Sequence, residues 1–266
     1  MKKRISRPVR LAVCALCALT AVCAFAAACA QPRRHVTVLM YHNFAPEEEY
    51  CQTAWTMQPD RLREDLEWLA EHGYATVLPS ELAEGVLADG QPLPDKAVML
   101  TFDDGYESNY TYAFPLLQEF GAKAAVALIV GKIGTEPGFL TWDECREMAE
   151  SGLVEFGSHT YDSHGGDGGS TQGIARLAGE TREEYALRVG GDLDESVNVI
   201  EHELGKKPAY FAYPLGKVEP WANELIGNAF RVSVTSKRGR ACPERSLYKL
   251  PRYNVTQTER AESFVK

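Results

Sequence analysis

The chain has 266 residues, of which 45% are hydrophobic and 24% are charged, and its formal net charge is −9. This length and hydrophobic content suffice for one α/β domain with a large core. Residues 1–30 contain five Lys or Arg and no Asp or Glu, so the remainder has 23 basic and 37 acidic residues, a net charge of −14. A body this acidic, without a basic patch, argues against nucleic acid as a partner and favours a neutral or cationic substrate.

The N-terminus has the pattern of a secretory signal. Five basic residues between Lys2 and Arg10 precede an uncharged stretch, Leu11 to Ala30, that ends in small residues. We expect residues 1–30 to be a signal peptide or a lipoprotein signal, cut after Ala30 or before Cys29, and residues 31–266 to be the mature domain. An uncleaved anchor is the alternative, although the stretch is weakly hydrophobic for the ~20 residues that a membrane span needs. The protein is therefore expected outside the cytoplasm, secreted or tethered to the outer face of the cytoplasmic membrane.

Three of the seven cysteines lie beyond this segment. Cys51, Cys145 and Cys242 are far apart and have no CxxC spacing, so they do not indicate a zinc cluster. One disulfide among them is an open alternative. For Cys145, which falls on a predicted helix, we favour a buried core thiol.

Predicted strands and helices alternate along the whole body. Strands are indicated by short β-branched and apolar runs, and helices by periodic leucines with Pro, Ser or Thr near the start and Gly at the end. In the first half we expect strands at 36–40, 75–78, 97–102 and 124–130. We expect helices at 59–72 and near 110–120, and a short helix that begins after Ser80 as its N-cap. In the second half we expect a helix from Thr141 to about Glu150 that opens with a capping box, a long helix that ends at Leu204, and a helix at 220–228. We expect strands at 154–156, 209–213 and 230–234, and a Gly-rich loop at 165–173.

This alternation predicts a parallel sheet covered by helices, either a barrel or a doubly wound sheet. Polar motifs follow four of the predicted strands: Tyr41-His42, Asp103-Asp104, His159 and Tyr213-Pro214. In a β/α barrel the carboxyl ends of all strands meet on one face, where the active site lies. The position of the motifs therefore favours the barrel with a single site.

The motifs contain two carboxylates and two histidines that could hold a metal. Asp103 and Asp104 are adjacent, and on an extended backbone their side chains point apart, so we expect one to bind a divalent metal and the other to stay free as a base. His159 and His164 are five residues apart and share a face in neither a helix nor a strand. They converge only if their segment bends, and residues 162–166 are turn-prone. From spacing alone, an ordinary turn and two surface histidines remain open.

Three motifs in this order resemble those of a known family. They are Thr-Phe-Asp-Asp-Gly-Tyr at 101–106, Ser-His-Thr-Tyr-Asp-Ser-His at 158–164 and Phe-Ala-Tyr-Pro-Leu-Gly at 211–216. Together they resemble the successive motifs of the polysaccharide deacetylases (NodB-homology proteins, carbohydrate esterase family four), over residues 35 to 256. Met-Tyr-His at 40–42 is similar to the start of the domain in the branch of poly-N-acetylglucosamine deacetylases.

The resemblance implies a deformed (β/α) TIM-like barrel of about seven strands. It also implies a metal-dependent amidase that removes acetyl groups from N-acetylglucosamine units. Asp103 matches the general base of the family. Asp104, His159 and His164 match the ligands of one divalent metal ion, usually Zn²⁺.

The third motif and the C-terminus supply the remaining site residues that the resemblance implies. The backbone N–H of Leu215 would help to stabilise the oxyanion, and Tyr213 and Pro214 would line the sugar pocket. Many relatives also have an Arg that holds the base, five residues before the Pro of this motif. Here that position is Ala209, and Arg252 is the candidate substitute.

A general acid must protonate the leaving amine, and the C-terminal Leu-x-x-His that many relatives use is missing here. Of His35, His42, His72 and His202, only His42 follows a strand on the expected active-site face. The resembling branch assigns this role to that histidine, so we expect His42 to be the acid. A core histidine satisfied by hydrogen bonds is the alternative.

The expected partner is an N-acetylated polysaccharide, with membrane contact only through the N-terminal signal or a lipid anchor. An O-acetyl esterase acting on xylan or another glycan would use the same metal chemistry. A non-catalytic glycan-binding module is a further alternative, against which the intact Asp103, Asp104, His159 and His164 argue. The sequence identifies neither the natural polymer nor the oligomeric state.

Overall fold

The computed structural model describes residues 35–49, 53, 55–86, 92–165 and 173–265. The predicted signal at 1–30, Cys51 and most of the predicted Gly-rich loop therefore lie outside the described residues. Within the described ranges, no helix has the length and apolar character needed to cross a bilayer.

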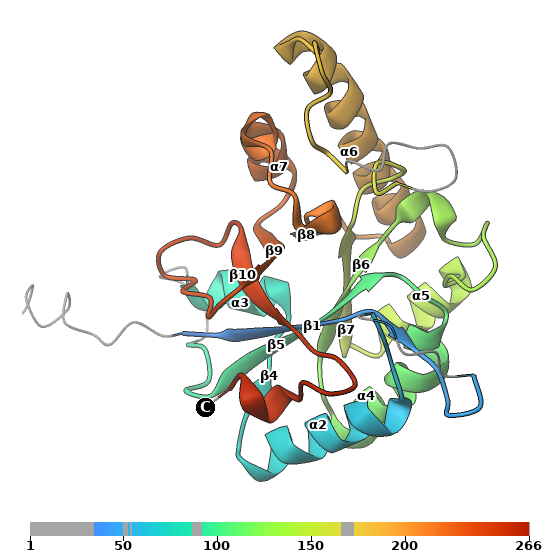
Figure 1. Ribbon diagram of the computed structural model, residues 1–266, viewed down its shortest axis with the longest axis vertical. Coiled ribbons are helices and arrows are strands. Elements are labelled where there is room, and N and C mark those ends of the chain that lie inside the picture. The colour runs from blue at the N-terminus through green and yellow to red at the C-terminus, as the bar shows by residue number, and fades with distance from the viewer. Residues whose placement is uncertain (1–34, 50–52, 54, 87–91, 166–172, 266) are drawn as a thin grey trace, which may run out of the picture. The chain divides into compact units, whose positions relative to one another are not determined.

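Seven parallel strands close into a barrel (Figure 1). They are β1 (Thr37–Tyr41), β5 (Ala97–Asp104), β6 (Ala124–Leu128), β7 (Val154–Ser158), β8 (Tyr210–Ala212), β9 (Val232–Arg238) and β10 (Leu250–Asn254). The strands follow one another around the barrel in chain order, and β1 closes it by pairing with both β5 and β10. The predicted β/α barrel of about seven strands is confirmed.

Three short strands lie beside the barrel. The predicted strand at 75–78 is only two residues long, β4 (Ala75–Thr76), and it pairs with the start of β5. The chain after β1 forms a small parallel pair from β2 (Asn43–Phe44) and β3 (Thr56–Met57). Two-residue strands carry no readable periodicity, and the β2–β3 pair was not predicted.

Helices cover the outside of the barrel and one end of it. They are α2 (Pro59–Glu71), α3 (Pro79–Val86), α4 (Phe114–Phe120) after a π-helical turn η1 (Asn109–Ala113), α5 (Trp142–Glu150), α6 (Arg182–Leu204) and α7 (Asn223–Ala229). Single 3₁₀ turns are η2 (Val130–Lys132), η3 (Pro214–Gly216), η4 (Pro220–Ala222) and η5 (Ala261–Ser263). The capping box predicted at Thr141 is present, and Thr181 forms another at the start of α6.

Side chains alternate along the strands between the inside of the barrel and the helical layer. On β5, Val98, Leu100 and Phe102 pack outward in the same core cluster as residues of α2, α4 and α5. Ala97 and Met99 belong instead to the cluster that fills the barrel interior. Successive side chains of a strand point to opposite faces, so Thr101 and Asp103 continue the inward set. The alternation therefore places Asp103 inside the barrel at its carboxyl end.

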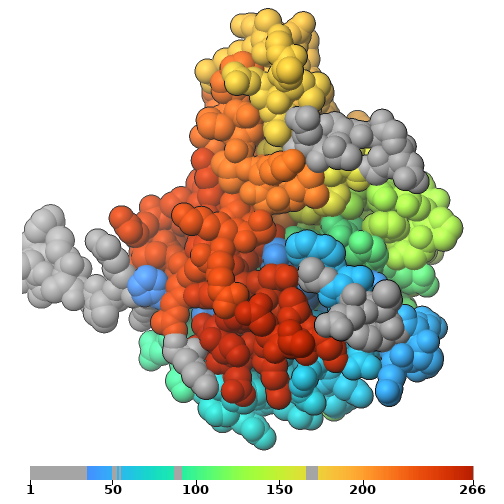
Figure 2. Space-filling model, in the orientation of Figure 1, coloured from blue at the N-terminus to red at the C-terminus, as the bar shows by residue number. Residues whose placement is uncertain are grey.

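The C-terminal segment (red) lies against α2 (cyan) in Figure 2, and a buried carboxylate of α2 fixes it there. Asp65 of α2 is 1% exposed and accepts hydrogen bonds from the Tyr41 hydroxyl (3.1 Å) and the Ala261 backbone N–H (3.0 Å). Burial raises the pKa of Asp65 to about 6. The same contact anchors the end of β1, directly before His42.

Two local predictions have opposite outcomes. Ser80 does not cap its helix, because α3 already begins at Pro79 and the Leu78 N–H donates to Glu81 (2.9 Å). The Ser80 hydroxyl donates instead to Glu155 on β7. Cys145 is a fully buried free thiol, and the core assignment is confirmed.

Gly157 is required by the contact between β7 and β8. A Cβ atom there would lie 2.4 Å from the carbonyl oxygen of Tyr210 and 2.8 Å from its Cβ. We expect Gly157→Ala to destabilise the fold by about 1–3 kcal/mol in urea unfolding, because backbone must move to relieve the overlap. Gly191→Ala on α6 is the control: nothing lies within 4 Å, and Ala favours a helix by about 1 kcal/mol over Gly. Equal midpoints for Gly157→Ala and the parent chain would contradict the close packing.

Candidate active site and metal centre

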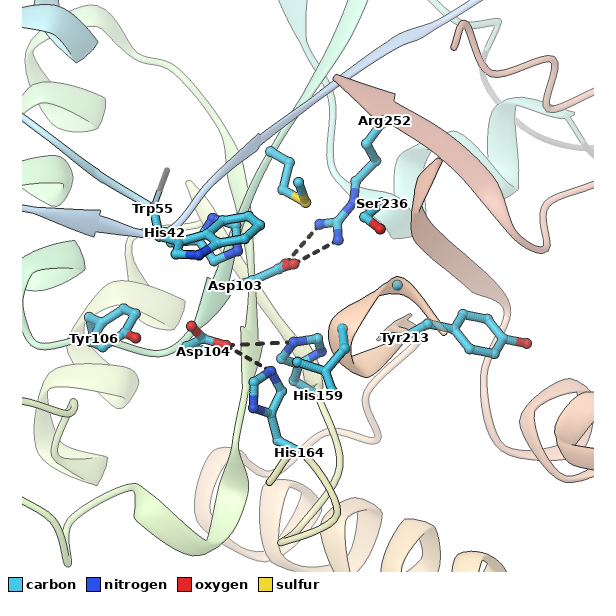
Figure 3. A pocket seen from close by; sticks show the side chains of 13 residues that line it. His42, Trp55, Asp103, Asp104, Tyr106, His159, His164, Tyr213, Ser236 and Arg252 are labelled. Carbon is cyan, nitrogen blue, oxygen red and sulfur yellow. Dashed lines mark hydrogen bonds and ion pairs between the residues drawn. The ribbon is translucent and has the colours of Figure 1, made fainter. Parts of the chain in front are cut away.

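A pocket of about 350 Å³ opens at the carboxyl ends of the barrel strands (Figure 3). It brings together side chains that are more than 200 residues apart in the sequence, from His42 after β1 to Arg252 on β10. Of the nine site residues that the sequence predicted, all but Pro214 contribute to its wall. Pro214 is buried at the start of the turn η3.

Asp103 is held by Arg252 deep in the pocket. The two side chains are 3% and 1% exposed, and the guanidinium donates to both carboxylate oxygens, Nη1 to Oδ1 (2.8 Å) and Nη2 to Oδ2 (2.6 Å). Arg252 also donates from Nε to the Thr235 carbonyl (2.9 Å) and from Nη1 to the Thr101 hydroxyl (3.0 Å). The guanidinium is therefore fixed by three strands, β5, β9 and β10.

The charge of Arg252 decides the ionisation of Asp103. Burial is the largest single influence and would raise the pKa of this carboxyl. The charge and hydrogen bonds of Arg252, together with His159 and His42, outweigh it and hold the pKa well below its usual range. Asp103 is therefore ionised at neutral pH although it is buried. An ionised carboxylate that is oriented in this way can accept a proton in the pocket.

Asp104, His159 and His164 form a cluster beside this pair. One ligand atom from each lies within 4.8 Å of the others, and the Nε2 atoms of His159 and His164 are 3.6 and 3.4 Å from Asp104 Oδ1. Figure 3 shows the three side chains pointing toward one another. From the sequence we expected the two adjacent carboxylates to point apart. In the structure Asp103 faces Arg252, and Asp104 faces the two histidines.

The donor set of this cluster matches a divalent metal ion. Asp104 Oδ1 is buried and has no hydrogen-bond partner, which is costly without a cation to face. The Nδ1 atom of His159 lies 2.8 Å from the Ala212 carbonyl, so Nδ1–H donates to it and Nε2 is left as a free lone pair. Burial lowers the pKa of both histidines, that of His159 to about 4, and so favours the neutral ring that binds metals. Two imidazoles and a carboxylate are a common catalytic zinc set.

Asp192 of α6 organises the segment that carries the two histidines. Its carboxylate accepts four hydrogen bonds, from the backbone N–H groups of Tyr161 (2.9 Å), Asp162 (2.9 Å) and Ser163 (3.0 Å) and from the Ser163 hydroxyl (2.9 Å). These bonds produce the bend that allows His159 and His164 to converge. Sequence reasoning missed Asp192, because nothing local marks one acidic residue within a long charged helix.

Backbone strain is concentrated in the site. Among the described residues, four non-glycine residues have positive φ, and three of them lie in the three motifs: Asp104 (77°), Thr160 (78°) and Leu215 (56°). Such conformations persist only when the surroundings hold them. Gly216 follows with φ +64°, and a Cβ atom there would lie 1.7 Å from the Ser236 hydroxyl. The third motif is thus packed directly onto β9.

His42 lines the same pocket as Asp104, His159 and His164. The other candidates for the acid, His35, His72 and His202, do not line it. Burial lowers the pKa of His42 to about 4, and its Nδ1 atom is buried without a hydrogen-bond partner. The ring of Trp55 lies over it, with ring centroids 4.6 Å apart. In Figure 3 His42 lies beside Trp55 and near Asp103, and its role as the acid stays a prediction.

The ring of Tyr213 is turned away from the carboxylates in Figure 3. Tyr213 contributes to the pocket wall, but its ring packs with Phe211 in the core beneath α6 and α7. Leu215 is 47% exposed at the pocket rim. Pocket residues that the sequence did not suggest include Trp55, Tyr106 and Ser236.

Comparison with known proteins identifies the family. Residues 90–229, more than half of the chain, match the polysaccharide deacetylase family model, and the chain belongs to this family. It is 32% identical over 223 residues to the poly-beta-1,6-N-acetyl-D-glucosamine N-deacetylase of Escherichia coli K12, covering 73% of this chain and 33% of the relative. The chain thus spans about a third of the length of that relative.

Solved structures show the same architecture. IcaB from Ammonifex degensii is 30% identical, with a TM-score of 0.71 over 84% of this chain and 92% of its own. The de-N-acetylase from Aggregatibacter actinomycetemcomitans is 25% identical, with a TM-score of 0.72 over 84% and 96% of the two chains. The family resemblance read from the three motifs is confirmed.

Asp192→Asn tests the organising role of the α6 carboxylate. The amide turns a donor toward the backbone N–H groups of 161–163, so we expect metal affinity to fall about 10–100-fold, as is usual for groups that position ligands. Calorimetric titration of the metal-free protein with Zn²⁺ measures this. Asp194→Asn, an exposed neighbour on the same helix, should bind zinc as the parent chain does. Equal affinities for the two variants would show that Asp192 does not shape the site.

Arg252→Met tests the buried ion pair and has a defined pH dependence. In the parent chain Asp103 has a lowered pKa, so the pair stabilises the fold above the unfolded pKa of about 3.9 and loses this effect as pH falls. In the variant the largest influence that opposes burial is gone, so the pKa of Asp103 rises. We expect a loss of about 3–5 kcal/mol near neutral pH, shrinking as pH falls toward about 4 and the carboxyl protonates.

Urea unfolding of the chelator-treated protein over this pH range measures the effect. Arg63→Met is the matched control, because Arg63 forms a bidentate pair with Glu119 on the surface, where solvent screens the charges and the pair adds little stability. A deficit for Arg252→Met that is independent of pH would contradict the proposed ionisation of Asp103.

Proposed function

We propose that the protein is a metal-dependent hydrolase that removes N-acetyl groups from a polysaccharide containing N-acetylglucosamine. One observation carries the proposal: the ionised Asp103, fixed by Arg252, shares a pocket with the cluster of Asp104, His159 and His164. A free base beside a metal site is an arrangement that can hydrolyse an unactivated amide. The names of the relatives, N-deacetylases of poly-beta-1,6-N-acetyl-D-glucosamine, support this substrate class.

Asp104, His159 and His164 would hold the metal ion, and their two nitrogens and one oxygen suit Zn²⁺. When bound, such an ion polarises a carbonyl and lowers the pKa of water. The protein side chains divide the remaining work. Asp103 accepts the proton of the attacking water, and Arg252 holds it in place for this step.

His42 donates a proton to the leaving amine in this proposal. Its pKa of about 4 leaves the ring neutral in the free protein, so the proton that it gives to the amine must first reach it during turnover. The source of this proton is the attacking water, which gives it up to Asp103. The backbone N–H of Leu215, in the strained turn after β8, is the proposed donor to the oxyanion. Leu215, which is 47% exposed at the pocket rim, contributes to the wall around the acetyl-bearing sugar.

We further propose that the protein acts outside the cytoplasm, secreted or tethered to the membrane by its N-terminal signal. The support is the basic and apolar sequence pattern of residues 1–30. The body, with a net charge of −14, would tolerate a polymer that gains positively charged amines as it is deacetylated.

Acetate release from β-1,6-linked N-acetylglucosamine oligomers tests the function. We expect release that stops when the metal is removed with a chelator and returns when Zn²⁺ is added, because the acetamide carbonyl is unreactive without the ion. Acetylated xylan oligomers, measured in parallel, test the esterase alternative. Release from xylan alone would replace the amidase by an esterase. Zinc binding without release from either substrate, or from peptidoglycan fragments, would contradict the hydrolase.

A further inference from the structure

A tryptophan is exposed at the rim of the active-site pocket. Trp55 has 51% of its surface accessible to solvent, although large aromatic side chains are normally well buried. Six large apolar side chains are exposed in the described part of the chain, and two of them, Trp55 and Leu215, line this pocket. They follow β1 and β8, which lie on opposite sides of the barrel. Exposed apolar surface around a pocket indicates a ligand with an apolar face.

The backbone of Trp55 is held in place on both sides. Its N–H donates to the Thr53 hydroxyl (3.1 Å), and its carbonyl accepts from the Asn43 N–H (3.0 Å), next to the β2–β3 pair. The β2–β3 pair is in turn tied to the barrel, because the Phe44 N–H donates to the Ser108 hydroxyl (3.0 Å). The Trp55 indole therefore projects over the pocket from a backbone position that is tied to the barrel.

Part of the indole already has a partner. The Trp55 and His42 rings are tilted by 57° with centroids 4.6 Å apart, and Figure 3 shows the indole lying across His42 above Asp103. This contact shields the His42 ring from water. The remaining half of the indole surface is open toward solvent at the pocket.

We propose that Trp55 is the binding platform for the sugar ring that carries the reacting acetamide, an inference that rests on the proposed function. In that reaction water adds to the acetyl carbonyl, the C–N bond breaks, acetate leaves and the sugar nitrogen gains a proton. The carbonyl must therefore face the cluster of Asp104, His159 and His164, while the nitrogen faces its acid, His42.

The sugar ring is bonded to this nitrogen, so it lies on the His42 side of the pocket, where Trp55 is. A pyranose chair has one face composed mainly of C–H groups, and such a face packs well on an indole. Packing there also excludes water from His42 and from the breaking bond. Trp55 thus selects a cyclic sugar over other acetylated compounds.

The test compares two substrates of different size. A β-1,6-linked N-acetylglucosamine oligomer needs the platform, whereas vinyl acetate carries an acetyl group but neither a sugar nor an aromatic ring that could stack on the indole. For Trp55→Ala we expect the ratio of kcat/KM values, oligomer over ester, to fall at least about tenfold, mainly through KM. Trp55→Phe, which keeps an aromatic face, should recover most of this ratio. Leu187→Ala, which truncates an exposed side chain outside the pocket, is the control.

An equal loss on both substrates would overturn the proposal, because Trp55 would then act through His42 or through folding. An unchanged ratio would overturn it as well. Oligomer binding to the inactive Asp103→Asn protein, measured by calorimetry with and without Trp55→Ala, separates the platform from catalysis. If the parent chain releases no acetate but Trp55→Ala weakens oligomer binding about tenfold, the proposed function fails and the platform stands. If Trp55→Ala leaves oligomer binding unchanged, the platform is wrong.

Discussion

The buried ion pair between Arg252 and Asp103 is the interaction on which the site depends. It joins two residues 149 positions apart in the chain, on β5 and β10, the strands that flank β1 in the closed barrel. Removing two charges from water is costly, and pairing with two short hydrogen bonds offsets that cost only when geometry is good. An apolar pair could close the barrel as well. Only the ion pair, however, keeps a buried carboxylate ionised, and a base must be ionised to accept a proton.

Next to this pair, two adjacent carboxylates have different environments and different expected roles, one as a base and one as a metal ligand. Asp103 faces a fixed cation and stays charged, while its neighbour Asp104 faces two neutral histidines and has a buried oxygen without a partner. The separation depends on strained backbone at Asp104 and Thr160 and on the carboxylate of Asp192, which holds the loop between the histidines. The rigid strands below supply the stability that this strain requires.

The barrel and most of the site followed from local patterns: apolar runs for strands, leucine periodicity for helices, and polar motifs at strand ends. The features that could not be predicted from the sequence depend on contacts between residues far apart in the chain. Asp192 binds a segment 30 residues away, and no local signal distinguishes it from other acidic residues of α6. Arg252 was a candidate only because Ala209 leaves the usual arginine position empty. Tyr213 turns its ring toward Phe211, and Ser80 donates to Glu155 rather than capping α3, because neighbouring elements offered better partners.

The most direct test of the central claim is acetate release by Asp103→Asn, measured together with its bound zinc. If Asp103 is the base and Asp104, His159 and His164 are the ligands, the variant will bind as much zinc as the parent chain and release acetate at least about 100-fold more slowly. Parental activity in the variant would contradict the assignment of the base. Loss of zinc together with activity would contradict it in another way, because Asp103 would then be a metal ligand.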